Sequence, residues 1–355
     1  MNSQCLISFG SNLGRRDCLI SDAAKIIADS PYVDQLLTSR LFETPPIGGP
    51  SGQEPFLNAV GAFETSASAR EILKMLQQTE QKLGRERKIR WDARSIDLDV
   101  VLHGELVGGG TGLIVPHPRY TARQFVLQPA CDVAAHYRDP RFGWTIQQLA
   151  EHLEAAAPSI ALVGGSESLR IELCDQLNEI FGITTFPTVH SLPESLVANS
   201  QVDPHQSLQR VTPATNRRTL ADPQSPPVAT TPEQVRDKHA NNSQAGAGRS
   251  RSNPTGEAWV SGFVPHLESS LGEQKHSLEP VQSGQLVPRL IGRIQSSSEN
   301  SPWPAPHQMW PSGWNWPEYR LEIDDKKWAV CELFSAIDSM RCPVKPITED
   351  GHWWE

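Results

Sequence analysis

The order of strand-like and helix-like segments over residues 4–155 constrains the fold most strongly. Short apolar runs bounded by glycine, proline or polar residues indicate strands, and apolar residues that recur every three or four positions indicate helices. In chain order the candidates are the strand Leu6–Phe9, the helix Arg15–Ala28, the strands Val33–Phe42 and Phe56–Phe63, the helix Ala69–Leu83 and the strand Ser95–Leu102. This order predicts an α+β domain, a ferredoxin-like split βαβ unit with an antiparallel sheet.

The composition changes after this domain, and we expect four parts in all. Residues 1–157 form the first domain, and 158–189 form a small α/β unit with one strand, a glycine turn and one helix. Residues 190–300 are rich in Ser, Pro, Gln, Asn and Thr, which bury too little apolar surface to offset the entropy of ordering, so a disordered linker is predicted. Residues 301–355 carry most of the ten tryptophans and one helix expected over Lys327–Met340, with the small α/β unit as its packing partner.

Charge and cysteine usage exclude several classes of protein. The net charge of −9 argues against nucleic-acid binding, which needs a basic face. The six cysteines form no CxxC pair, so neither a zinc site nor a disulfide framework is indicated. We find no secretory leader pattern and no apolar stretch of membrane-spanning length. These features predict a cytoplasmic protein without membrane or nucleic-acid partners.

Two aspartates carry the clearest chemical signal. Asp97 and Asp99 are two positions apart on an expected strand, so their carboxylates leave the same face while Leu98 points to the other. Paired carboxylates favour a divalent cation, and magnesium completes its octahedron with waters and substrate phosphates. A basic cluster within residues 85–94 precedes them and suits those phosphates. Taken alone, such a pair is more often simply the wet face of a strand.

The surrounding motifs make the aspartate pair specific. Residues 84–100 read GRERKIRWDARSIDLDV, and further motifs follow the same order along the chain: GSNLG at 10–14, TPPIG at 44–48, FLNA at 56–59 and VPHPR at 115–119. Together they resemble the 6-hydroxymethyl-7,8-dihydropterin pyrophosphokinase family over about residues 4–157. The resemblance implies an ATP-dependent diphosphokinase that transfers pyrophosphate from ATP to the pterin alcohol and releases AMP, in tetrahydrofolate biosynthesis.

The resemblance also implies a role for individual residues. Two magnesium ions are expected at Asp97 and Asp99, and ATP is the co-substrate. The implied catalytic residues are Asp97, Asp99, Arg85 and Arg94. The implied nucleotide-binding residues are Gln77, Glu80, Arg87, Trp91, His117 and Arg123. The implied pterin-binding residues are Thr44, Pro45, Ile47, Phe56, Asn58 and Phe125, with the ring stacked between the two phenylalanines.

Two other functions stay open from the sequence. One is an inactive nucleotide-binding scaffold whose tail supplies the function through unknown protein partners. The other is a bifunctional fusion with a nucleoside-kinase-like second domain, suggested by Gly164-Gly165 after a strand. That segment lacks the lysine and the Ser/Thr of a phosphate-binding loop, because Arg170 and Ile171 occupy their places. The aspartate pair and its arginines favour the enzyme over both alternatives.

Overall fold

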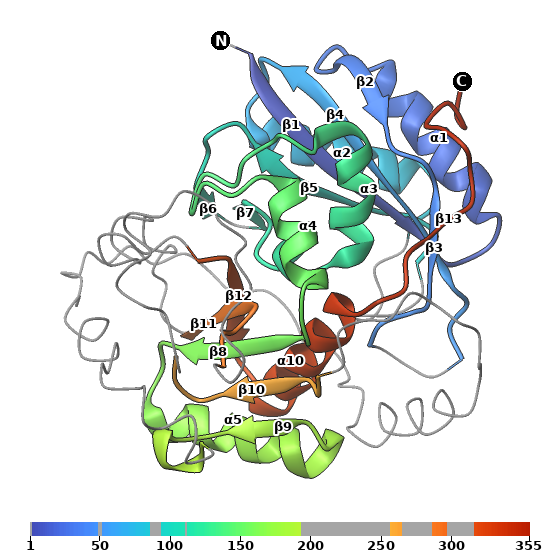
Figure 1. Cartoon of the computed structure of the whole chain (residues 1–355). Coiled ribbons are helices and arrows are strands. Elements are labelled where there is room, and N and C mark those ends of the chain that lie inside the picture. The colour runs from blue at the N-terminus through green and yellow to red at the C-terminus, as the bar shows by residue number, and fades with distance from the viewer. Residues whose placement is uncertain are drawn as a thin grey trace.

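The described residues form two large sheets with helices between them, and a separate two-stranded hairpin (Figure 1). In this computed structural model the described residues are 2–48, 52–85, 94–110, 112–192, 256–264, 286–296 and 316–355. One large apolar core joins residues of the antiparallel sheet, the helices α3 (Gln124–Ala134) and α4 (Ile146–Glu154), and the parallel sheet beyond them. This shared core crosses the domain boundary expected at residue 157.

The N-terminal sheet is antiparallel and has six strands. Its order is β13-β3-β4-β1-β5, with β2 also paired to β4. The strands are β1 (Ser3–Ser11), β2 (Asp34–Thr38), β3 (Phe42–Thr44), β4 (Phe56–Thr65), β5 (Asp97–His103) and β13 (Lys345–Pro346). A separate hairpin pairs β6 (Gly108–Gly110) with β7 (Leu113–Val115). The α+β class and the antiparallel sheet are confirmed, while the finer ferredoxin-like assignment stays a prediction.

Two helices cover one face of this sheet. They are α1 (Arg16–Ala28) and α2 (Ala69–Lys82), as the apolar spacing predicts. The Ser68 hydroxyl caps α2 by accepting from the Glu71 backbone N–H. In return, the Glu71 carboxylate accepts from the Ser68 backbone N–H. The strand expected over Val33–Phe42 is two strands, because the Ser39 hydroxyl accepts from Val60 N–H at 2.9 Å and interrupts the regular ladder.

The C-terminal unit, which comprises the elements from β8 to α10, is a parallel sheet with helices. Its strand order is β12-β11-β8-β10-β9. The elements are β8 (Ser159–Val163), α5 (Glu167–Phe181), β9 (Thr184–Phe186), β10 (Trp259–Ser261), β11 (Leu290–Ser296), β12 (Glu318–Ile323) and α10 (Lys326–Met340). The Phe181 and Phe334 rings stack at 4.0 Å, so α10 does pack on α5 as expected. Two 3₁₀ turns are η1 (Tyr120–Ala122) and η2 (Val189–Ser191).

Disorder throughout residues 190–300 is a wrong expectation for two segments. The strands β10 and β11 lie within that range and pair on either side of β8. Val260, Leu290 and Ile291 are fully buried there. The average composition of residues 190–300 is polar, so these short apolar runs were not recognised as strands. They become buried only when they pair with β8, which is distant in the sequence. The rest of that range, apart from 190–192, 256–264 and 286–296, lies outside the described residues.

The end of the chain returns to the N-terminal sheet. In Figure 1 the final red segment runs from α10 up to the edge strand β3. The indole N–H groups of Trp353 and Trp354 donate to the Ser39 carbonyl and the Thr38 hydroxyl, both at 2.7 Å. The tail thus completes the sheet of the first domain. None of the helices in the described part of the chain has the length and apolar character of a membrane crossing.

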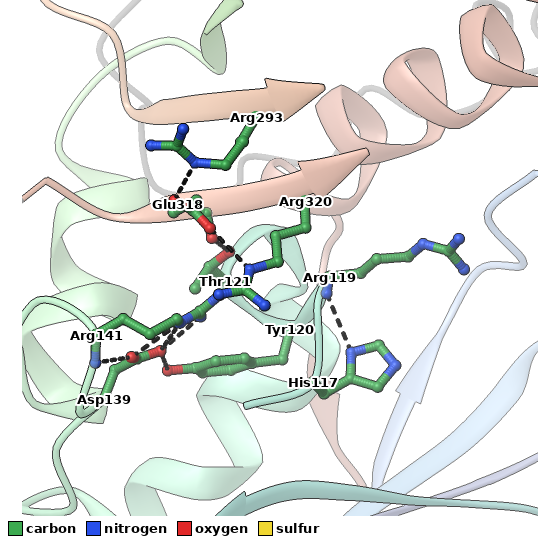
Figure 2. Close-up of polar contacts among 9 residues, drawn as sticks. All are labelled: His117, Arg119, Tyr120, Thr121, Asp139, Arg141, Arg293, Glu318 and Arg320. Atoms are coloured by element: carbon green, nitrogen blue, oxygen red, sulfur yellow. Dashed lines mark hydrogen bonds and ion pairs between the residues drawn. The ribbon is translucent and has the colours of Figure 1, made fainter. Parts of the chain in front are cut away.

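Two clusters of buried charge, one in each unit, meet where the units contact each other (Figure 2). Glu318 of β12 accepts from Arg293 and Arg320, each at 2.8 Å. Burial alone would raise the pKa of Glu318, but these arginines outweigh burial and the pKa is lowered. Nearby, Asp139 accepts from Arg141 at 2.6 Å and from the Tyr120 hydroxyl at 2.7 Å. Thr121 also donates to the Glu318 carbonyl at 2.8 Å, so β12 holds the 117–121 turn.

We expect Glu318→Gln to lower the free energy of unfolding by about 3 kcal/mol, because two buried guanidinium groups lose their counter-charge. Urea denaturation of the full chain measures this change. The control is Lys326→Gln, which breaks the exposed Lys326–Glu172 pair and should change stability by less than about 0.5 kcal/mol. Equal effects of the two substitutions would contradict a structural role for the buried network.

We also expect acid sensitivity from His152 of α4. Burial, with the nearby Arg289, lowers the pKa of His152 to about 3. The unfolded chain takes up this proton below about pH 6.5, so the stabilisation is complete above that pH and is lost as the pH falls. Between pH 7 and pH 5 the wild type should lose about 2 kcal/mol more unfolding free energy than His152→Gln. His136→Gln, at an exposed site, should keep the wild-type pH dependence in the same denaturation series.

Candidate active site

A cavity of about 1040 Å³ lies between the antiparallel sheet and the C-terminal unit. Its lining comes from β1, β3, β4, β5, α2 and α3, and also from β12 and α10. Every predicted site residue that the structure describes lines this cavity, with the exception of Glu80. The other two, Arg87 and Trp91, lie outside the described residues. The fold therefore gathers side chains from residue 44 to residue 125 into one place.

The aspartate pair stands on β5 as its alternation predicts. Asp97 pairs with Gly10 of β1, and Asp99 pairs with Ser8. Both aspartates line the cavity, and Leu98 between them also belongs to the apolar core formed with α1 and α2. β5 is the outermost strand of this sheet, and its ladder with β1 fixes the backbone that sets the spacing between the two carboxylates.

Arginines surround Asp97. Its two oxygens form ion pairs with Arg85, at 2.7 Å, and with Arg94. Glu80 of α2 is buried behind the cavity, where its carboxylate pairs with Arg85 and accepts from Leu98 N–H at 2.9 Å. The structure thus places Glu80 as a residue that positions Arg85 and β5, rather than facing a nucleotide as expected.

Asp99 faces a second pair of basic side chains. His117 Nε2 lies 3.7 Å from its carboxylate, and Arg123 Nη1 lies 3.8 Å away. Burial lowers the pKa of His117 well below its usual value, and Arg123 and Arg119 lower it further. The neutral ring accepts the Arg119 backbone N–H at Nδ1, 3.2 Å away, so its own proton is on Nε2 and points toward the cavity.

The electrostatics of this end favour an anionic ligand. Burial lowers the pKa of Arg123 even though Asp99 opposes the change. The protein thus places too little negative charge beside the buried Arg123 guanidinium to offset its burial. Phosphate oxygens would supply the missing negative charge. The described residues contain no group of three or more His, Cys, Asp or Glu side chains arranged to hold a metal. Two carboxylates fit magnesium, which takes its remaining ligands from water and phosphate.

The other end of the cavity is apolar and neutral. Asn58 of β4 donates to the Thr44 hydroxyl at 2.9 Å, and Pro45, Ile47 and Phe56 line the wall beside them. A side chain at Gly10 would meet Asn58, Asp97 and Phe56 within 4 Å, so its absence leaves room at their meeting point. The Arg123 guanidinium lies 5.6 Å from the Phe125 ring, which links this end to the basic end.

Sequence reasoning missed two groups of residues. The first group is Ser11 and Asn12, which bind the segment just before β5. Ser11 donates to the Ser95 carbonyl at 2.6 Å, and the Asn12 side chain accepts from Arg94 N–H at 2.7 Å. The GSNLG motif contains both residues, but the sequence alone assigned neither of them a role. The second group is Tyr319, Ser335, Ala336 and Ser339 of the C-terminal unit, which no motif marks.

The glycine turn of the C-terminal unit is already occupied. The buried Arg170 side chain donates to the carbonyls of Gly164, at 2.9 Å, and Gly165, at 3.1 Å. A phosphate-binding loop presents backbone N–H groups inward, whereas carbonyls face this centre. Gly164 is also required by packing, because a side chain there would lie 2.6 Å from the Ile294 carbonyl. These contacts disfavour a second kinase site.

Several known proteins are similar in sequence to the N-terminal unit. Residues 6–135 match the model of the family 7,8-dihydro-6-hydroxymethylpterin-pyrophosphokinase (HPPK). The 2-amino-4-hydroxy-6-hydroxymethyldihydropteridine pyrophosphokinase of Bacillus subtilis is 37% identical over 133 residues, which are 38% of this chain and 79% of that protein. Its namesake in Pseudomonas aeruginosa is 35% identical over 140 residues, 39% of this chain and 86% of that protein. The bifunctional protein FolKE of Lactococcus lactis (strain IL1403) is 27% identical over 190 residues, 53% of this chain and about half of its own length at 54%.

We expect Glu80→Gln to weaken binding of Mg·ATP about tenfold, because Arg85 loses the charge that holds it toward the cavity. The amide oxygen can still accept from Leu98 N–H, so the unfolding temperature should change little. Isothermal titration with a non-hydrolysable ATP analogue measures the affinity, and Glu64→Gln on the exposed face of β4 is the control. An unchanged affinity would show that Arg85 needs no partner at position 80.

Proposed function

This chain belongs to the 7,8-dihydro-6-hydroxymethylpterin-pyrophosphokinase family, and we propose that its cavity around Asp97 and Asp99 is the site of pyrophosphate transfer. The reaction moves pyrophosphate from ATP to 6-hydroxymethyl-7,8-dihydropterin and belongs to folate synthesis. One observation supports the site above all others: the two carboxylates stand where an arginine-rich end of the cavity meets an apolar, hydrogen-bonding end.

Asp97 and Asp99 would hold two magnesium ions together with the ATP phosphates. Their exposed oxygens face the cavity, and Arg85 and Arg94 now balance the charge of Asp97. Bound magnesium supplies charge neutralisation and polarises the phosphoryl oxygens. On binding of Mg·ATP these two arginines would turn from Asp97 to the phosphates, which keeps every charge in the site paired.

The nucleotide would lie along the basic end. Arg85, Arg94 and Arg123 would bind the triphosphate, and His117 would donate from Nε2 without adding charge. Gln77 of α2 lines the same cavity. Arg87 and Trp91, which the resemblance assigns to nucleotide binding, lie outside the described residues. The pterin hydroxymethyl oxygen attacks the β-phosphorus, the bond from that phosphorus to the α-phosphate oxygen breaks, and AMP leaves with the electron pair. The hydroxyl proton passes to water as the new oxygen–phosphorus bond forms, so that atoms and charges balance.

The pterin would occupy the neutral end. Phe56 and Phe125 would stack on its two faces, a geometry in which aromatic rings gain from offset contact. Asn58, Thr44 and the backbone of 44–48 would bind its hydrogen-bonding edge. This arrangement would direct the hydroxymethyl group toward Asp97, because Gly10 leaves the space between Phe56, Asn58 and Asp97 open.

Two alternatives are not favoured. A second kinase site would have to displace Arg170 from the carbonyls that it binds. An inactive scaffold would not need the carboxylates and arginines that the cavity retains. All six cysteines are free thiols, which supports the proposal that the chain works in the reducing cytoplasm.

Nucleotide product analysis tests this function. The full chain is mixed with Mg·ATP and 6-hydroxymethyl-7,8-dihydropterin, and we expect AMP that forms only when the pterin is present. Asp97→Asn should lower kcat by about a thousandfold or more, because the metal loses a charged ligand at the reacting phosphates. The matched control is Asp132→Asn. Asp132 lies on α3, and the substitution breaks its exposed ion pair with Arg40, so this variant should retain wild-type turnover. ADP as the product, or full activity of Asp97→Asn, would refute the proposed chemistry.

A further inference from the structure

The C-terminal unit forms one wall of the active-site cavity. Ser335, Ala336 and Ser339 of α10 line it, and Tyr319 of β12 lies beside them. The three helix residues are spaced so that they share one face of α10. Large side chains of the same helix, Leu333 and Ile337, are fully buried in the apolar core instead. The cavity therefore faces a strip of α10 with small side chains.

The contacts made along α10 indicate which end of the cavity this helix lines. Before Ser335, the Glu332 carboxylate accepts from Arg119 at 2.6 Å and neutralises it. After Ser339, the Cys342 thiol hydrogen-bonds the side chain of Thr44, at the neutral end of the cavity. Between these points α10 packs against η1 and against α3, the helix that carries Phe125. Glu332 and Arg119 neutralise each other at the start of this wall, and the hydroxyl groups that follow on α10 suit an uncharged heteroaromatic ring.

Ser335 has the feature expected of an unused ligand contact. Its side chain is buried, with the residue only 8% exposed. Its hydroxyl oxygen has no hydrogen-bond partner among the described residues, not even the carbonyl four residues back that a helical serine commonly uses. Buried hydroxyl groups are normally satisfied, so an unpaired one on a residue that lines the cavity is available to a ligand once its side chain turns toward it.

We propose that the Ser335 hydroxyl hydrogen-bonds the bound pterin, and that α10 sets the width of the slot in which the pterin lies. This inference rests on the proposed function. It makes the C-terminal unit part of the substrate site, although the family match ends at residue 135. Ala336 and Ser339 flank the contact and leave room for the ring.

Substrate binding by the full chain tests the proposal. Isothermal titration measures the affinity for 6-hydroxymethyl-7,8-dihydropterin in the presence of magnesium and a non-hydrolysable ATP analogue. Ser335→Ala should weaken pterin binding about tenfold and leave the affinity for the analogue unchanged. Its unfolding temperature should stay level or rise, because alanine is the better helix former and no hydroxyl is left unpaired. A merely structural serine would not weaken binding while preserving stability.

Two further variants complete the experiment. Cys331→Ala removes one heavy atom from a buried residue of the same helix that does not line the cavity, and it should bind pterin like the wild type. Ala336→Val narrows the slot and should also weaken pterin binding selectively, which keeps the proposal testable if Ser335→Ala does not fold. Wild-type pterin affinity in Ser335→Ala or in Ala336→Val, or an equal loss for the ATP analogue, would overturn the inference. Failure of the wild type to form AMP would instead contradict the proposed function.

Discussion

Two clusters of buried charge, one in each unit, meet where the C-terminal unit packs against the 117–121 turn, and the position of that turn depends on this contact. Glu318 can be buried because Arg293 and Arg320 bind both of its oxygens, and Asp139 can be buried because Arg141 and Tyr120 bind it. Removing either set of partners would leave an uncompensated charge in the core. Figure 2 shows both clusters meeting at the turn that begins with His117. The turn therefore depends on the parallel sheet for its hydrogen bonds to β12.

The consequence reaches the active site directly. The 117–121 turn carries His117, the partner of Asp99, and its neighbour Arg119 is held by Glu332 of α10. The backbone N–H of Arg320 also donates to the Pro118 carbonyl at 2.9 Å, which adds the turn to the edge of β12. The basic end of the cavity is thus positioned by residues about 200 positions further along the chain. In this protein the C-terminal unit acts as structural support and as a cavity wall.

The C-terminal unit has the layout of a ligand-binding α/β sheet without an open site at its glycine turn. Such sheets bind ligands at the carboxyl ends of the strands, at the point where the strand order reverses. Here the order reverses next to β8. Arg170 fills the turn after β8 and bonds to the Gly164, Gly165 and Gly262 carbonyls. The same arginine ties the turn after β8 to Gly262, which follows β10, and so stabilises the sheet.

The sequence by itself determined the local features: the helices α1, α2, α5 and α10, most strands of the first sheet, and the two carboxylates on one face of β5. These follow from periodicities of two and 3.6 residues, which a short segment carries whatever its surroundings. Tertiary structure decided the pairing of β10 and β11 with β8, the position of Glu80 behind Arg85, and the presence of Ser335 in the cavity. Each of these depends on contacts between segments far apart in the chain, where burial and charge pairing override local composition.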